Sequence, residues 1–246
     1  PGIFVILLGG IAARITNIPG VIAAISGLGY IFIDQGFVAS FRRFFVRVLY
    51  KVSLGHKNLR IICQNLNDLD EIQRATNVSN DSFSLIDGSG VALNKFIYVP
   101  DLNKIPKVMM ASRLLKDKGV IEFAEAAAIL KGKNIDAEFI LVGDPDLDNP
   151  SSIQSSQVKQ WEQKGILNCW GHVDNMQDIL SQASIVVLPS YREGFPKVLI
   201  EAAACGRAVI TTDVAGCRDA IYNGVTGVLV PAKDANSLAA AIFDLV

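Results

Sequence analysis

A strand, a polar loop, a helix and a second strand follow one another from Ser184 to Thr212, and this unit limits the possible folds most. Ile185 to Leu188 is a short apolar, β-branched run, which is typical of a strand covered on both faces. Pro196 suits the first turn of a helix, and Gly206 suits a left-handed cap at its end. Such a unit indicates a parallel sheet, and open α/β folds bind ligands at the carboxyl edge of that sheet.

Two glutamates fall at this predicted edge. Glu193 lies in the loop and Glu201 in the helix, with seven residues between them. Glu201 lies near the N-terminal end of its helix, where free backbone N–H groups and the helix dipole attract phosphate. Two glutamates at this spacing are by themselves more often a loop charge and a solvated helix residue. Here turn chemistry, strand pattern and charge placement agree, which favours a functional site.

Composition narrows the classes of function. Half of the 246 residues are hydrophobic and 19% are charged, which indicates a globular protein with a substantial core. The net charge of −1 gives no electrostatic footprint for nucleic acid, so no nucleic-acid partner is expected. Two histidines make a histidine-based metal site improbable. The four cysteines form no C-x-x-C pair, so reduced thiols in a cytoplasmic protein are the default interpretation.

Strands and helices alternate along the whole sequence, which predicts an α/β fold with two doubly wound parallel sheets. We expect a first domain over 1–98, a proline-containing linker over 99–106 and a second domain over 107–246. The apolar run from Phe4 to Ala13 is too short to span a bilayer and is predicted to be a buried helix. Because the chain begins at Pro1, without Met, at the start of this apolar segment, we expect it to be truncated at its N-terminus.

The two glutamates, the loop E-G-F-P and the glycine-closed helix together resemble the retaining glycosyltransferases of family four, which have the GT-B fold of two Rossmann-like domains. Three motifs of that family's first domain occur here in the same order: S-G-L-G-Y at 26–30, Q-N-x-x-D at 64–68 and G-S-G-V at 88–91. The family usually has Asp after the last valine, whereas this chain has Ala92, so that loop's contact is not carried over. The resemblance implies that the first domain lacks its opening strands, and a chain of this length is expected to transfer little or no sugar alone.

The resemblance also assigns roles to residues. Glu193 would accept hydrogen bonds from the donor sugar's hydroxyls, while Arg113 and Lys118, in the segment after the strand at Val108, would stabilise the departing diphosphate. Glu201 would accept hydrogen bonds from the ribose. The other donor-binding positions lie in two loops and around the start of the helix: Gly143, Asp144, His172, Val173, Gly194, Phe195, Pro196, Lys197 and Val198.

Two of these positions have an alternative interpretation. His172 could be catalytic, but a role in the loop or against the nucleobase is favoured. Asp144 and Asp146 match a D-x-D metal motif by letter, yet they fall in a turn on the nucleobase side. No metal ion or other cofactor is therefore expected, and the nucleotide sugar is a substrate.

The leading hypothesis is a retaining hexosyltransferase that uses a UDP-sugar. The stretch from Met110 to Asp219 is similar to bacterial transferases that build polysaccharide on polyprenyl-diphosphate carriers at the inner face of the plasma membrane. This similarity implies a polyprenyl-diphosphate-linked or other glycan acceptor and a donor such as an N-acetylated hexosamine. Two alternatives stay open: a sugar-nucleotide 2-epimerase of the same fold, and a nucleotide-binding module without catalysis.

A basic, aromatic helix is predicted from Phe41 to Leu54. Its aromatic face either packs on the first sheet, as α/β domains require, or makes peripheral contact with anionic lipid. Its basic residues are Arg42, Arg43, Arg47 and Lys51, set beside Phe44, Phe45, Val48 and Tyr50.

Overall fold

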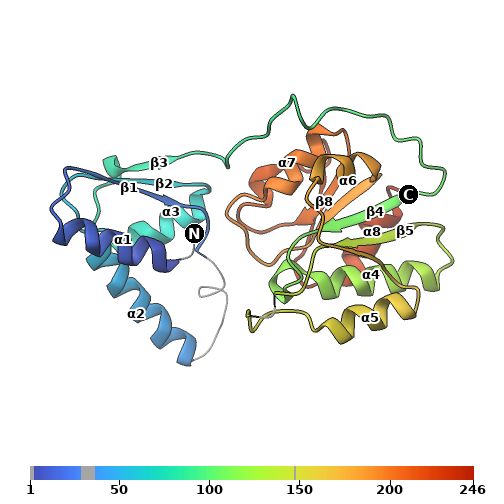
Figure 1. The fold of residues 1–246 in the computed structure, drawn as a ribbon, viewed down its shortest axis with the longest axis horizontal. Coiled ribbons are helices and arrows are strands. Elements are labelled where there is room, and N and C mark those ends of the chain that lie inside the picture. Colours follow the sequence, from blue (N-terminus) through green and yellow to red (C-terminus); the bar gives the residue numbers. More distant parts are fainter. Residues whose placement is uncertain (1–2, 29–36, 147) are drawn as a thin grey trace. The chain divides into compact units, whose positions relative to one another are not determined.

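The computed structural model describes residues 3–28, 37–146 and 148–246, without the side chains of residue 3 and residues 37–43. Gly29 and Tyr30 of the predicted glycine loop, and the side chains of Arg42 and Arg43, therefore lie outside the described residues. Two compact units divide the chain: residues up to 89 together with Arg192–Phe195 form the first, and 90–191 with 196–246 form the second. Each unit has its own parallel sheet, so the predicted α/β class is confirmed (Figure 1).

The first unit contains a three-stranded parallel sheet in the order β1-β2-β3. Ile25 pairs with Cys63, and Cys63 pairs with Leu85. The three strands therefore end at the same edge, and the loops that follow them lie together. The strands are β1 (Val21–Ile25), β2 (Leu59–Cys63) and β3 (Phe83–Leu85), and the helices are α1 (Ile3–Ile15), α2 (Phe37–Ser53) and α3 (Leu66–Ala75).

The first helix, α1, corrects one prediction. Leu7 and Ala13 are buried, but Phe4 and Leu8 are 74% and 66% exposed, so the expectation of a buried helix is wrong for one side. Within the described residues α1 packs mainly on α2 and β1, and these two elements cover only part of its circumference. The helix packs closely at Gly10, where a Cβ would lie 2.4 Å from the carbonyl oxygen of Ser53.

The second unit contains a six-stranded parallel sheet in the order β6-β5-β4-β7-β8-β9. The chain moves outward from β4 through β5 to β6, and then returns to the other side of β4 and continues through β7 to β9. The order of the sheet therefore reverses between β4 and β7, which is where open α/β sheets leave a crevice for ligands. The strands are β4 (Lys107–Ala111), β5 (Glu138–Val142), β6 (Asn168–Gly171), β7 (Ile185–Leu188), β8 (Ala208–Thr212) and β9 (Val228–Val230).

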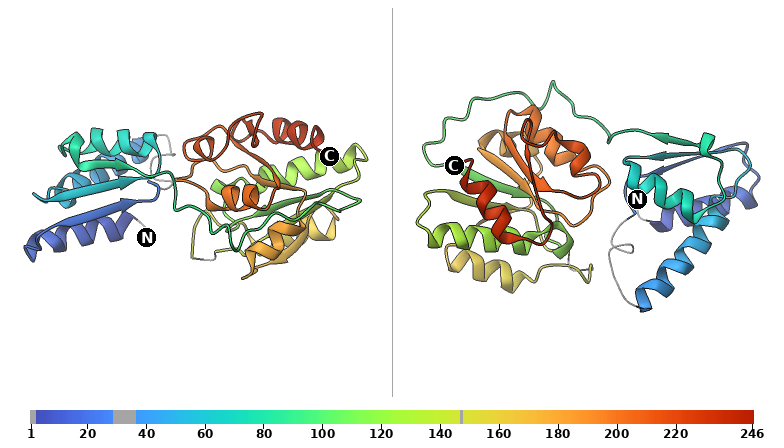
Figure 2. Two further views of the ribbon diagram at one scale, coloured as in Figure 1. Left: turned by 90° about the horizontal axis from the view of Figure 1, so that it is seen from above. Right: turned by 180° about the vertical axis from the view of Figure 1, so that it is seen from behind.

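Helices cover both faces of this sheet (Figure 2). Because crossovers between parallel strands are right-handed, helices that connect strands in opposite directions along the sheet lie on opposite faces. Accordingly α4 packs against α8, and α6 packs against α7. The helices are α4 (Val120–Gly132), α5 (Ser155–Gln163), α6 (Met176–Gln182), α7 (Lys197–Ala204) and α8 (Ala235–Phe243).

The strand–loop–helix–strand unit predicted from the sequence is β7, α7 and β8. All four residues of β7 are buried, as expected for a strand covered on both faces. Pro196 precedes the first turn of α7, and Gly206 follows the helix with a φ of 73°. In the described part of the chain, no helix combines the length and the apolar character needed to cross a bilayer.

Candidate active site

A cavity of about 310 Å³ opens where β4, β5 and β6 end. It brings together residues from three separate loops and from the first turn of α7. Six of the predicted site residues line it: Arg113, Gly143, Asp144, His172, Val173 and Val198. The sequence prediction that these loops form one site is therefore consistent with the geometry of the second unit.

The walls of this cavity are fixed by backbone contacts at the ends of the strands. Gly143 has a φ of 130°, and a Cβ there would lie 1.9 Å from the carbonyl oxygen of Ser112. Its N–H donates to the carbonyl oxygen of Gly171 at 2.8 Å, so the turn after β5 is tied to the end of β6. Only glycine fits this turn, because any side chain would both strain the backbone and displace the turn after β4.

Polar side chains extend from the cavity into solvent. The Arg113 side chain is 65% exposed, and its Nη1 lies 3.3 Å from Oδ2 of Asp146. His172 Nε2 lies 3.3 Å from Oδ1 of Asp174, an ion pair only when the imidazole is protonated. An exposed Arg–Asp pair is weak enough to exchange its carboxylate for a phosphate, which binds a guanidinium with the same geometry.

The start of α7 adjoins the cavity, because Val198 belongs to both. No side-chain hydrogen bond caps the first turn of this helix, so its N-terminal N–H groups and dipole are available to an anion. Glu201 is buried, with 7% of its surface exposed. Lys197 Nζ lies 3.2 Å from its Oε1 and holds the carboxylate one turn from the helix start.

Lys118 lies on the same loop system but does not line the cavity. It is half-buried in a short 3₁₀ helix, Lys116–Lys118, which ends at Gly119. A Cβ at Gly119 would lie 2.1 Å from the carbonyl oxygen of Pro189, so this 3₁₀ helix packs directly on the loop after β7. The structure thus places both predicted cations between β4 and α4, with Arg113 at the cavity and Lys118 next to Gly119, which contacts Pro189.

Tyr191 anchors the beginning of that loop in the second unit. Its hydroxyl donates to Oε1 of Glu122 at 2.5 Å, and its N–H donates to the carbonyl oxygen of Asp117 at 2.8 Å. Burial, followed by the hydrogen bond to Glu122, raises the pKa of Tyr191 well above its usual range. The ammonium of Lys233 lies 4.8 Å from the centre of the ring. The hydroxyl therefore stays protonated and acts as a donor.

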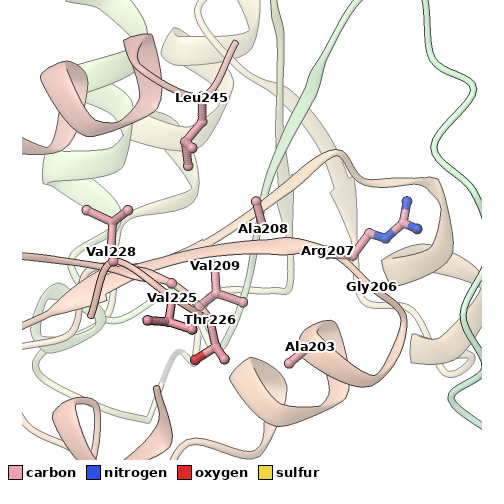
Figure 3. Close-up of a pocket in the computed structure, with 11 residues that line it drawn as sticks. Ala203, Gly206, Arg207, Ala208, Val209, Val225, Thr226, Val228 and Leu245 are labelled. Carbon is pink, nitrogen blue, oxygen red and sulfur yellow. The ribbon is translucent and has the colours of Figure 1, made fainter. Parts of the chain in front are cut away.

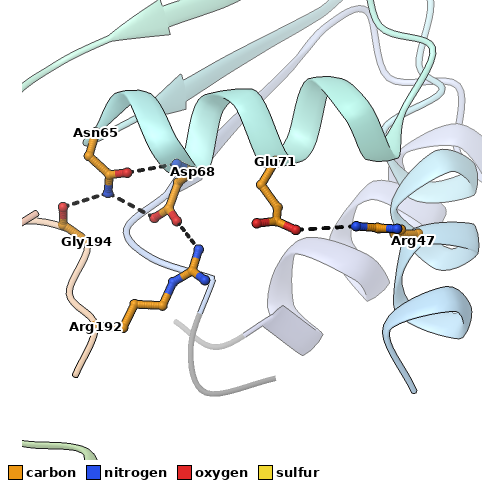
Figure 4. A network of polar contacts seen from close by, with 6 residues as sticks. All are labelled: Arg47, Asn65, Asp68, Glu71, Arg192 and Gly194. Atoms are coloured by element: carbon orange, nitrogen blue, oxygen red, sulfur yellow. Dashed lines mark hydrogen bonds and ion pairs between the residues drawn. The ribbon is translucent and has the colours of Figure 1, made fainter. Parts of the chain in front are cut away.

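The next four residues, Arg192–Phe195, pack with the first unit instead. Arg192 Nη2 donates to Oδ1 of Asp68 at 2.5 Å, and Asn65 Nδ2 donates to the carbonyl oxygen of Gly194 at 2.8 Å (Figure 4). Sequence reasoning gave Arg192, Asn65 and Asp68 no role at the site. The available signal was the motif Q-N-x-x-D, which was noted only as part of the resemblance.

A second cavity, of about 460 Å³, lies away from the predicted site (Figure 3). Ala208 and Val228, the first residues of β8 and β9, are among its lining residues. It is therefore at the amino edge of the sheet, opposite the edge where ligands of open α/β folds bind. Its ionisable lining residue, Arg207, points away from the other lining side chains and donates to backbone carbonyls. This cavity is not a candidate for the nucleotide.

Residues 105–246 match the family model described as glycosyl transferases group 1. The chain belongs to this family. Over 245 residues it is 36% identical to the N,N'-diacetylbacillosaminyl-diphospho-undecaprenol alpha-1,3-N-acetylgalactosaminyltransferase of Campylobacter jejuni. This alignment covers 94% of the chain and 62% of that protein. It is 27% identical over 254 residues to the UDP-Gal:alpha-D-GlcNAc-diphosphoundecaprenol alpha-1,3-galactosyltransferase of Escherichia coli, with 96% and 62% covered. The chain thus spans about three fifths of the length of these relatives.

Solved structures of similar proteins confirm the GT-B fold. Anabaena Alr3699/HepE in complex with UDP-glucose matches with a TM-score of 0.79 at 17% identity, covering 98% of this chain and 66% of that one. Sucrose-phosphate synthase from Thermosynechococcus elongatus matches with a TM-score of 0.78 at 25% identity, covering 97% and 62%. The two parallel sheets of this group 1 glycosyltransferase are therefore the two Rossmann-like halves of the GT-B architecture.

Proposed function

We propose that this group 1 glycosyltransferase is a retaining hexosyltransferase that moves a sugar, such as an N-acetylated hexosamine, from a UDP-sugar to a polyprenyl-diphosphate-linked acceptor. The observation that carries the proposal is the 36% identity, over nearly the whole chain, to a relative named for transfer of N-acetylgalactosamine to such an acceptor. The Glu193 and Glu201 pair supports retention by its resemblance to family four. Family membership favours transfer over the alternative of 2-epimerisation.

In this proposal the donor nucleotide occupies the cavity at the ends of β4, β5 and β6. The nucleobase packs between the Gly143–Asp144 turn and the His172–Val173 loop, which both line that cavity. The diphosphate rests on the uncapped first turn of α7, which begins beside the cavity. Glu201, already held by Lys197, accepts hydrogen bonds from the ribose hydroxyls.

The chemical step needs charge stabilisation where the glycosidic bond opens. The bond between the sugar's anomeric carbon and the diphosphate breaks, and its electron pair leaves with UDP. Arg113 and Lys118 balance the negative charge that develops there, while Glu193 orients the sugar through its hydroxyls. The acceptor hydroxyl then bonds the anomeric carbon from the same face as the departing UDP, and its proton passes to the diphosphate oxygen that has left. The proposed step assigns this charge balance to Arg113 and Lys118 and needs no metal ion.

The same proposal places the protein at the cytoplasmic face of the membrane, in contact with anionic lipid through α2. Phe44 and Phe45 are 65% and 57% exposed, and Lys51 is exposed on the same helix. Tyr50, by contrast, is fully buried and packs in the core of the first unit. The three aromatic side chains of α2 that the structure describes are thus divided between the core and the surface, and the exposed ones are available to a bilayer interface.

The test is a transfer assay on the full-length natural protein that carries this sequence. A panel of UDP-sugars is incubated with a polyprenyl-diphosphate-linked sugar, and the lipid product and its anomeric configuration are determined by mass spectrometry and NMR. We expect a product with the donor's own configuration. Glu193→Gln should lower kcat by ~10²–10³-fold, the range for losing one oriented polar contact to the transition state.

The matched control is Glu162→Gln on the exposed surface of α5, which should leave kcat unchanged. Formation of a free 2-epimer of the nucleotide sugar would instead support the epimerase. UDP binding without turnover of any sugar in the panel would support a nucleotide-binding module.

A further inference from the structure

The segment Arg192–Phe195 lies along the carboxyl edge of the sheet in the first unit. Its contacts fall on the loops that follow each of the three strands: Ser26 and Gly27 after β1, Asn65 and Asp68 after β2, and Gly88 after β3. These contacts are all internal to the first unit. Because β1, β2 and β3 end in register, the three loops form one continuous surface, which we call the loop socket.

The polar half of the loop socket is built on the first turn of α3 (Figure 4). Asn65 is the N-cap of this helix, and its Oδ1 accepts from the N–H of Asp68 at 2.8 Å. Its Nδ2 donates to Oδ2 of Asp68 at 3.0 Å and to the carbonyl oxygen of Gly194 at 2.8 Å. The other carboxylate oxygen of Asp68 accepts from Arg192. Asp68 is thus bound on both oxygens.

The ion pair between Arg192 and Asp68 is held in one geometry because it is buried. Asp68 is 0% exposed and Asn65 is 1% exposed, while the Arg192 side chain is 16% exposed. A buried ion pair whose partner is removed leaves an uncompensated charge away from water, so the two side chains hold one geometry. Asp68 binds Arg192, immediately before Glu193, and Asn65 binds Gly194, immediately after it.

The other half of the loop socket is a steric fit between backbones. A Cβ on Gly194 would lie 2.0 Å from the carbonyl oxygen of Ser26, and one on Gly27 would lie 3.3 Å from the N atom of Gly194. Gly88 has a φ of 65°, and a Cβ there would lie 2.4 Å from the ring of Phe195. Side chains at these positions would therefore push the segment away from the sheet.

We propose that the loop socket sets the position of the Glu193 carboxylate, and that Asp68 and Arg192 are positioning residues for the transfer reaction. The inference rests on the proposed function, because the role of Glu193 is assigned there. Both chain neighbours of Glu193 are fixed by contacts, so its carboxylate is aimed by the first unit rather than by a freely moving loop. The proposal also gives one common role to the motifs S-G-L-G-Y, Q-N-x-x-D and G-S-G-V, since each contributes one side of the loop socket.

The experiment separates positioning from binding in the full-length protein. Arg192→Met, Asp68→Asn and the double variant are compared with wild type by kcat for transfer and by the Kd for UDP in calorimetry. We expect kcat to fall by ~10²-fold, the cost of misplacing a reacting group by about 1 Å, with the Kd for UDP changed less than ~2-fold. The double variant should fall no further than the worse single variant, because both remove the same contact.

Two further variants test alternative explanations. Arg192→Lys keeps a cation within reach of Asp68 and should recover part of the lost kcat; this measurement also decides the matter if Asp68→Asn does not fold. Asp70→Asn, on the exposed surface of the same helix α3, is the matched control and should change neither kcat nor Kd.

Three results would overturn the inference. Folded variants that keep the wild-type kcat would show that the loop socket does not position Glu193. An equal loss of kcat and of UDP affinity would assign the contact to the fold instead of to positioning. In both cases the proposed function stands if wild type transfers sugar. A wild-type protein that neither binds UDP nor transfers sugar would overturn the proposed function, and the role given to Glu193 would fall with it.

Discussion

Arg207 shows how one side chain can join separate segments of the second unit. It is only 4% exposed, and its Nε and Nη1 donate to the carbonyl oxygens of Cys205 and Ala183, both at 2.9 Å. Its Nη2 donates to the carbonyl oxygen of Val99. One guanidinium therefore satisfies backbone acceptors at the end of α7, at the end of α6 and in the segment before β4.

Removing this guanidinium should destabilise the second unit. Arg207→Met leaves three carbonyl groups without their donor, and at ~1 kcal/mol for each lost partner the free energy of unfolding should fall by about 3 kcal/mol. Urea denaturation followed by tryptophan fluorescence measures this, because both tryptophans, Trp161 and Trp170, belong to the second unit. Arg218→Met is the control: this arginine bonds Asp213 at the surface, so its loss should cost ~1 kcal/mol or less. Equal effects of the two substitutions would contradict the role given to Arg207.

At the scale of elements, local pattern was sufficient for the strands and for the order of the chain. Short apolar runs predicted β7 and β8 closely, and both strands are almost wholly buried, as expected for strands covered on both faces. Pattern was not sufficient for α1, since an apolar helix looks the same in sequence whether neighbours cover one side of it or all of it.

The candidate site divides in the same way. Loops at the carboxyl edge of the second sheet could be predicted, because every parallel strand ends there. The hydrogen bond between Arg192 and Asp68 could not be predicted, because it joins residues 124 positions apart and no rule of sequence spacing covers such a pair. The untested roles of Glu193, Lys118 and the remaining site residues stay predictions.

The helix α2 gives a prediction about the membrane. Replacing Arg42, Arg43 and Arg47 with Gln should reduce binding to anionic vesicles, by up to ~1 kcal/mol for each charge lost near the surface. Arg47 should contribute less than this, because its Nη2 lies 3.5 Å from Oε1 of Glu71. Glu71→Gln should accordingly strengthen vesicle binding, whereas the affinity for UDP should not change in either variant. Co-sedimentation across a salt series is the measurement, and identical curves for wild type and the arginine variant would leave α2 as an ordinary helix of the fold.

On the scale of the whole molecule, the two units have separate cores. Leu28, Ile61 and Ile72 are fully buried in the first, and Phe123 and Ile210 are fully buried in the second. Each core also contains buried thiols: Cys63 lies in the first unit, and Cys205 and Cys217 in the second. Burial, with a further contribution from the charge of Asp68, raises the pKa of Cys63 to about 12, so this thiol is protonated and unreactive until its unit opens.

These thiols can show which unit binds the nucleotide. If UDP binds the second unit, then UDP at ~100 times its Kd should add about 2.7 kcal/mol to the unfolding of that unit. Alkylation in increasing urea, read by mass spectrometry, should then show Cys205 and Cys217 protected to higher urea while Cys63 is unaffected. Glu201→Ala should remove ~1–3 kcal/mol of UDP affinity through its lost hydrogen bonds, and the protection should shrink accordingly.

UDP is used without its sugar because the proposed sugar contact, Glu193, packs with the first unit. A UDP-induced shift at Cys63 equal to that at Cys205 would mean that the nucleotide stabilises both units together, and the site would then not belong to the second unit alone.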